Sequence, residues 1–208
     1  MKRLLYILLL FVFVASPAAA QNFPRLTGRV VDQADILSAD QEASLSAKSQ
    51  TLETQSGPQL VIATVNSLEG YPIDDYAYRL GRAWKIGDEK RDDGIVLLVA
   101  PHERKVWIAT GYGAGASLTD AYSGVIIRED ILPQFKKGDY GAGITAGADA
   151  IIKQMSLPPD QAQANLDKAA QQQSKRGRTI EGAGFIPVII IVIIFFSIIG
   201  SLSRRSRG

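Results

Sequence analysis

The sequence predicts an α/β protein: a three-layer sandwich in which helices cover both faces of a mixed β-sheet, followed by a C-terminal transmembrane helix. Two observations support this fold class. Between residues 26 and 155, segments with helical periodicity precede, separate and follow short apolar strands. Further on, residues 185–202 form an uncharged apolar run that is long enough, as a helix, to cross a bilayer.

The N-terminus has the layout of a secretory signal peptide over residues 1–20. A short basic start is followed by the apolar run Leu4 to Val14 and by the small residues Ala18 to Ala20, which suit cleavage. The mature chain would then begin near Gln21. The alternative is a retained N-terminal membrane anchor, although the run is short for a span of roughly 20 residues.

One globular domain is predicted over residues 21–155, and its first elements are a helix and a buried strand. Ser38 is suited to cap the helix, and Gly57 ends it. Residues 59–65 are almost all apolar, which favours a strand that is buried on both faces. A helix is therefore expected to precede the first strand of the sheet core.

A second helix and a hairpin come next. Asp74 or Asp75 is expected to cap the helix, which runs to about Trp84 with its apolar residues spaced by four. The apolar runs 95–100 and 105–109 are separated by a short polar turn, so they are predicted to pair as an antiparallel hairpin.

Two further helices, over about 120–135 and 140–153, complete the domain. Residues 156–184 are rich in Gln, Ala, Lys and Pro and carry few large apolar side chains, which predicts a polar linker that is helical in part at most. After the predicted span 185–202, the basic tail 203–208 favours a cytoplasmic end. These features predict a single-pass protein of a bacterial inner membrane with a periplasmic domain.

The charge balance excludes some functions. The net charge of +2 depends on five basic residues in the two terminal segments; without them 18 basic residues stand against 21 acidic ones. This gives no electrostatic support for nucleic-acid binding. The chain has no cysteine, so an exported domain would rely on its core alone, without disulfides.

An acidic cluster is the main candidate site. If the hairpin forms, the start of its first strand and the end of its second lie at one edge of the sheet, which would bring Asp92 and Asp93 close to Asp120. Asp32 or Asp35 could join them. Oxygen ligands without cysteine favour a hard divalent cation, above all calcium. The alternative is that these aspartates cap helices and shape turns.

A glycine-rich loop lies among these aspartates. Backbone amides of Gly111, Gly113 and Gly115, together with Thr119 before the next helix, are candidate donors to an anion. The loop lacks the Lys-Ser/Thr of a phosphate loop and the spacing of a dinucleotide fingerprint, which argues against a nucleotide. No catalytic residue can be assigned from these patterns.

Four motifs in order resemble the TPM-domain family over residues 27–155. They are the Val31, Asp32, Ala34 and Leu37 pattern, the Asp92-Asp93-Gly94 strand start, the Gly111-Tyr-Gly113 loop with Leu118-Thr-Asp120, and Phe135 to Tyr140. The resemblance implies an exported domain with a sheet between helices, a nearby membrane segment and a metal-binding acidic pocket. Family members include a plant lumenal acid phosphatase and an animal channel subunit, so the fold does not define one activity.

Two functions are compatible with this resemblance. The first is a membrane-tethered periplasmic module whose calcium-binding pocket assists membrane or envelope proteins. The second is a metal-dependent phosphatase that hydrolyses phosphate esters at the same pocket, with metal-bound water as the nucleophile. This chain ends in a short basic tail rather than the long Gly/Ser-rich tail of many bacterial relatives.

Overall fold

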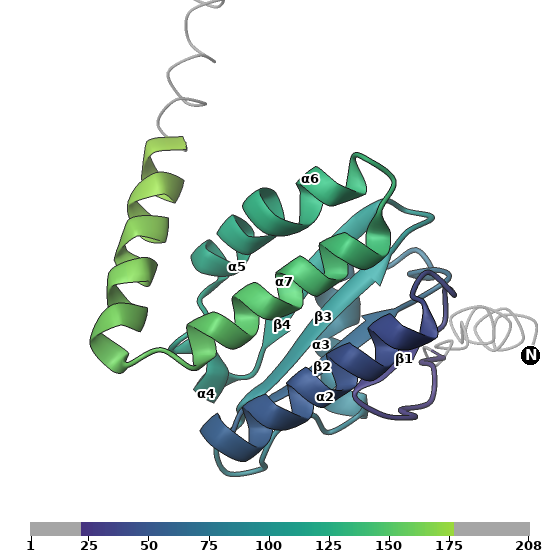
Figure 1. The fold of residues 1–208 in the computed structure, drawn as a ribbon, viewed down its shortest axis with the longest axis horizontal. Helices are drawn as coiled ribbons and strands as arrows, with labels where there is room; N and C mark the ends of the chain where they lie inside the picture. The colour runs from purple at the N-terminus through teal and green to yellow at the C-terminus, as the bar shows by residue number, and fades with distance from the viewer. Residues whose placement is uncertain (1–21, 177–208) are drawn as a thin grey trace, which may run out of the picture.

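The computed structural model describes residues 22–176, which form a four-stranded mixed sheet with helices on both faces (Figure 1). The strands are β1 (Val30–Asp32), β2 (Gln59–Thr64), β3 (Gly94–Ala100) and β4 (Lys105–Thr110), and they follow this order across the sheet. β1, β2 and β3 are parallel, whereas β3 and β4 form the antiparallel hairpin that the sequence predicted.

Helices on one face cover most of the sheet. These are α2 (Ala39–Ser56), the broken helix α5 (Asp120–Ile126), η1 (Ile127–Ile131) and α6 (Leu132–Phe135), and α7 (Tyr140–Met155). Figure 1 shows α2 and α7 side by side in front of the strands. Leu45, Leu97 and Ile144 belong to the core on this face, which is the larger of the two.

The opposite face is covered by α3 (Ile73–Ala83), which lies behind the strands in Figure 1. Its Tyr76 and Leu80 pack with Val96 and Leu98 of β3 in a separate core. Every residue of β3 is buried, because its side chains alternate between these two cores. The predicted α/β sandwich with helices on both faces is confirmed for the described residues.

The helix ends agree with the sequence at α2 and differ at α3 and α5. Ser38 caps α2 with a reciprocal bond to Gln41, as expected. Neither Asp74 nor Asp75 caps α3, because Pro72 lies at its N-cap and the two aspartates lie in the first turn. The expected helix over 120–135 is interrupted by η1, a π-helical turn. Pro133 lacks an amide hydrogen, and a wider turn before it avoids a clash with the preceding carbonyl groups.

The stretch predicted as a polar linker contains a helix over residues 159–176. Ala162, Leu166 and Ala169 are buried and lie on one side of it. The side chain of Gln154 holds the start of this helix: its Nε2 donates to the carbonyl of Ala162 at 3.3 Å and to that of Ser117 at 2.9 Å. Part of the predicted linker is therefore packed against the domain.

The predicted signal peptide 1–20, the rest of the linker 177–184, the transmembrane helix 185–202 and the tail 203–208 lie outside the described residues. Within residues 22–176, no helix combines the length and the apolar character that a membrane span requires.

Candidate functional site

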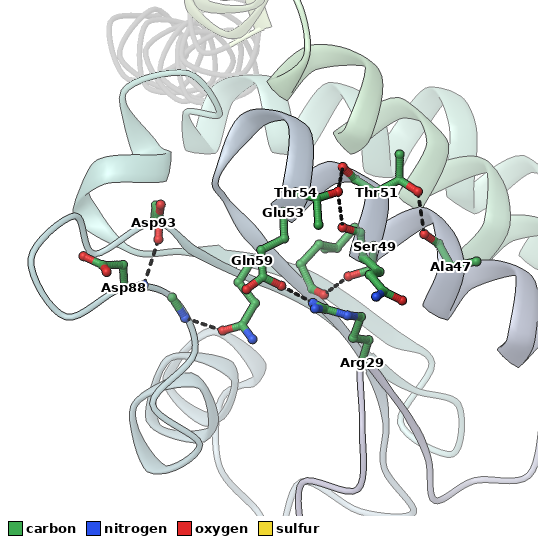
Figure 2. A network of polar contacts seen from close by, with 12 residues as sticks. Arg29, Ala47, Ser49, Thr51, Glu53, Thr54, Gln59, Asp88 and Asp93 are labelled. Atoms are coloured by element: carbon green, nitrogen blue, oxygen red, sulfur yellow. Dashed lines mark hydrogen bonds and ion pairs between the residues drawn. The ribbon is translucent and has the colours of Figure 1, made fainter.

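The loop between α3 and β3 is held in place by two polar side chains, the buried Asp93 and the half-buried Gln59. Asp93 is only 6% exposed, and its Oδ1 accepts a hydrogen bond of 2.9 Å from the amide of Asp88. The Oε1 of Gln59, at the start of β2, accepts one of 2.7 Å from the amide of Gly87. Figure 2 shows these two contacts on either side of the loop. They fix the chain where it turns from α3 into the hairpin.

Asp88 closes the loop on itself. Its Oδ1 accepts hydrogen bonds of 3.0 Å from the amides of both Lys90 and Arg91, and its carbonyl accepts one of 2.7 Å from the amide of Asp92. The amides of Arg91 and Lys90 lower the pKa of the Asp88 carboxyl, because they stabilise its charged form. This carboxylate acts as the organising group of a turn, as short acidic side chains commonly do.

Asp92 connects the loop to the glycine-rich segment after β4. It has a left-handed backbone, with φ of 47°, and its Oδ2 accepts a hydrogen bond of 2.9 Å from the amide of Tyr112. Its carbonyl accepts one of 2.9 Å from the amide of Gly113. A Cβ atom at Gly113 would lie 1.9 Å from the carbonyl oxygen of Arg91, so glycine is required for this contact.

The glycine loop does not have free donors for an anion, contrary to the expectation for Gly111, Gly113 and Gly115. Their amides donate to the carbonyls of Gly94, Asp92 and Gly111 respectively. Thr119 uses its hydroxyl to cap α5, where it accepts from the amide of Tyr122. These groups are satisfied within the protein because α4 (Tyr112–Gly115) packs its backbone directly against the Asp92 turn.

The predicted five-aspartate cluster does not form. Asp32 ends β1, in register with Thr64 and, through β2, with Val99, whereas Asp93 immediately precedes Gly94 at the other end of β3. Six residue steps along the strand separate these positions, or about 20 Å. The parallel pairing of β1 with β2, which the hairpin pattern does not reveal, places Asp32 and Asp35 at the wrong end of the sheet.

Each of these aspartates either stabilises local structure or lies apart from the other predicted ligands. Asp32 accepts from the Thr64 hydroxyl and, at 2.8 Å, from the amide of Leu37. Asp35 is exposed and has a left-handed backbone, and Asp120 lies in the first turn of α5 behind its cap, Thr119. Among residues 22–176, no three histidine, aspartate or glutamate side chains are grouped as a metal site would require. Calcium takes six to eight oxygens, so this set of donors fits it poorly.

What the loop does form is one wall of a cleft of about 620 Å³. The other wall is α3, and the floor consists of small and apolar side chains from α3, β3 and β4: Ala77, Val96 and Ala109. Charged side chains of both signs line it: Arg82, Lys85, Asp88, Glu89 and Asp92.

One exposed aromatic side chain lines this cleft, and a second lies next to it in sequence. Tyr78 on α3 is 52% exposed, and the guanidinium carbon of Arg82 lies 5.2 Å from the centre of its ring. Tyr112, next to the cleft residue Gly111, is 92% exposed. Neither Tyr78 nor Arg82 was predicted as a site residue from the sequence. Their spacing of four on an amphipathic helix, outside its apolar stripe, was the available signal.

The described residues thus form an α/β sandwich domain with a polar cleft beside α3, which the exposed side chain of Tyr78 lines. The chain belongs to the TPM-domain family, whose model matches residues 30–154. The solution structure of the N-terminal domain of a protein from P. gingivalis is similar, with 29% identity and a TM-score of 0.58, over 62% of this chain and 82% of that one.

A more distant structure also shares the fold. The N-terminal domain of a Corynebacterium glutamicum protein has 15% identity and a TM-score of 0.50, over 67% of this chain and 89% of that one. A protein from the psychrophilic bacterium Bizionia argentinensis has 19% identity and a TM-score of 0.49, over 59% and 83%. No curated protein matches the chain.

Proposed function

We propose that this chain is a membrane-tethered, periplasmic binding module that assists membrane or envelope proteins by holding a protein segment in the cleft between α3 and the Asp88–Asp93 loop. The observation that carries the proposal is the exposed pair Tyr78 and Arg82 at an open cleft with a small apolar floor. Tyrosine and arginine are enriched among the residues that dominate protein interfaces.

The tether and the location are part of the proposal. They rest on the sequence of the two ends: the signal-peptide pattern of residues 1–20 and the apolar run 185–202 with its basic tail. A module held at the membrane meets its partners at a high effective concentration, so a modest cleft is sufficient for function.

The metal-dependent phosphatase has less support in the cleft. Ester hydrolysis requires an activated nucleophile and free donors for the developing charge. The amides of Gly111, Tyr112 and Gly113 are already occupied, and both carboxylate oxygens of Asp93 accept bonds from within the loop. The surface that is left free therefore suits binding better than hydrolysis.

Calcium stays a prediction at this site. Asp92 uses Oδ2 for the amide of Tyr112, and no donor in the described part of the chain contacts its Oδ1. One carboxylate oxygen beside the cleft could contribute to a cation, but the remaining ligands would have to come from elsewhere. No step of the proposed function depends on this ion.

A turnover assay separates the two functions. Purified full chain is incubated with p-nitrophenyl phosphate in calcium, in magnesium and in EDTA, and compared with Asp92→Asn, a substitution that the left-handed backbone tolerates. Asp149→Asn, an exposed change on α7, is the matched control. We expect no metal-dependent turnover in the wild type, in Asp92→Asn or in Asp149→Asn. Turnover that Asp92→Asn abolishes and Asp149→Asn retains would establish the phosphatase and overturn the proposal.

A further inference from the structure

A second pocket lies at the other end of the β3–β4 hairpin. It has a volume of about 440 Å³, within the range of roughly 300–1,000 Å³ that ligand pockets occupy. One side is the hairpin turn, with Pro101, and the other is α6 with the turn that leads into α7. The cleft of the proposed function lies beside Gly94 and Thr110, at the opposite end of the same two strands.

Three cations surround this pocket: Arg104, Lys105 and Lys136. All three are exposed, and within residues 22–176 none of their side chains makes a hydrogen bond or an ion pair. Three unneutralised cations around one concavity create a positive potential that attracts anions.

Among the described residues, the acidic neighbours in sequence, Glu103 and Asp139, form no ion pair with these cations. Glu103 turns its Oε1 toward the amide of Leu68, which donates to it at 2.8 Å. Asp139 caps α7, where its Oδ1 accepts from the amide of Ala142 at 2.8 Å. The Leu68 amide also lowers the pKa of Glu103, so this carboxylate stays charged and remains committed to its own contact.

The floor of the pocket is aromatic and apolar. The rings of Phe135 and Tyr140 are in contact, tilted by 49° with centres 4.8 Å apart, and both line the pocket together with Leu132 and Pro101. Phe135, Tyr140 and Leu132 are each only partly buried. An apolar side chain placed on this floor would complete their burial, which is favourable in proportion to the area covered.

We propose that this pocket binds an acidic peptide segment, with one apolar or aromatic side chain on the Phe135–Tyr140 floor and carboxylates on Arg104, Lys105 and Lys136. A flat lipid surface would pair with the cations but would leave the concave floor uncovered. A peptide satisfies both, because a carboxylate and an aromatic side chain can lie next to each other along one chain. The site is independent of the cleft and of the function proposed for it.

Calorimetric titration of the full chain tests this assignment. The probe is a capped tetrapeptide, acetyl-Glu-Glu-Phe-Glu-amide, and the comparison peptides replace either the three glutamates with glutamine or the phenylalanine with alanine. The variant combines Arg104→Asn, Lys105→Gln and Lys136→Gln. Asparagine suits the left-handed backbone of Arg104, with φ of 55°, and all three positions are exposed, so the fold is retained. Lys168→Gln, on the helix over 159–176, is the matched control.

We expect the triple variant to weaken binding of the acidic peptide by about tenfold or more, since exposed ion pairs are weak singly and three act together here. Lys168→Gln should leave the affinity unchanged, and both comparison peptides should bind more weakly. The proposal is overturned if the acidic peptide shows no binding up to about 5 mM, or if the triple variant binds it like the wild type. It is also overturned if vesicles with phosphatidylglycerol, but not the peptide, bind in a way that the three cations control.

Discussion

The buried carboxylate of Asp93 accepts a hydrogen bond of 2.6 Å from Nε of Arg91, two residues earlier in the same loop. With the amide of Asp88 on its other oxygen, Asp93 is fully occupied inside the protein. A residue that looked like a metal ligand in the sequence therefore holds the loop that forms one wall of the cleft.

Asp93→Asn should destabilise the fold by about 1–3 kcal/mol, because the ion pair between the buried carboxylate of Asp93 and the guanidinium of Arg91 is lost. The loss should have the same size in calcium and in EDTA, since both oxygens are used within the loop. Urea unfolding measures it. Asp149→Asn, which breaks an exposed pair with Lys48, should change stability by less than about 1 kcal/mol. A loss seen only in calcium would show that Asp93 binds the ion.

Gly113→Ala should be strongly destabilising, by at least about 2 kcal/mol, because the added Cβ would lie 1.9 Å from a backbone oxygen that cannot move freely. Gly115→Ala, two residues later, is the control: its Cβ would lie 3.4 Å from the Thr110 hydroxyl, an ordinary contact. Thermal melting of the two variants should therefore differ clearly. Equal melting temperatures would show that the Asp92 turn does not pack against α4 as described.

Asp88 should contribute to acid sensitivity. Its pKa in the folded protein lies below the unfolded value of roughly 3.9, so the folded state binds fewer protons, and the contribution is present above that value. It is lost as the pH falls through the lowered pKa. Melting temperatures from about pH 6 to about pH 3 should fall less steeply for Asp88→Asn than for the wild type. Parallel curves would contradict this role.

Gln154→Ala should release the helix over residues 159–176 from the domain. The carbonyl groups of Ser117 and Ala162 would lose their donor, and Asn165 would lose the Oε1 that accepts its hydrogen bond of 2.9 Å. We expect faster hydrogen exchange in residues 159–176 than in the wild type, while β3 keeps its protection. Unchanged exchange in that helix would show that its attachment does not depend on Gln154.

Much of the fold could be predicted because its signals are local. The cap at Ser38, the apolar strands and the β3–β4 hairpin each follow from short stretches of sequence. The position of Asp32 could not be predicted in this way, because it depends on the parallel pairing of β1 with β2, whose paired residues are more than 30 positions apart in the sequence. The same limit explains why Asp32 and Asp35 appeared to join Asp92 and Asp93, although parallel register separates the two pairs.

Other differences have local causes that compete with one another. Thr119 and Asp120 are both good N-cap residues, and only the backbone shows that Thr119 takes this position. The helix over 159–176 has few large apolar residues, yet Ala162, Leu166 and Ala169 are buried, and Gln154 of α7 bonds to Ala162 and Asn165. The cleft could not be predicted from the sequence, because Tyr78 and Arg82 line it only when the Asp88–Asp93 loop lies opposite α3 in the folded chain.

Photo-crosslinking in the producing cell tests the central claim most directly, with benzoylphenylalanine placed at Tyr78 in the full chain. Gln50, exposed on α2 and on the other face of the sheet, is the control position. We predict a discrete cross-linked membrane or envelope protein from position 78, weakened by Arg82→Ala and missing from position 50. No cross-link from position 78, or the same products from both positions, would contradict a protein-binding cleft.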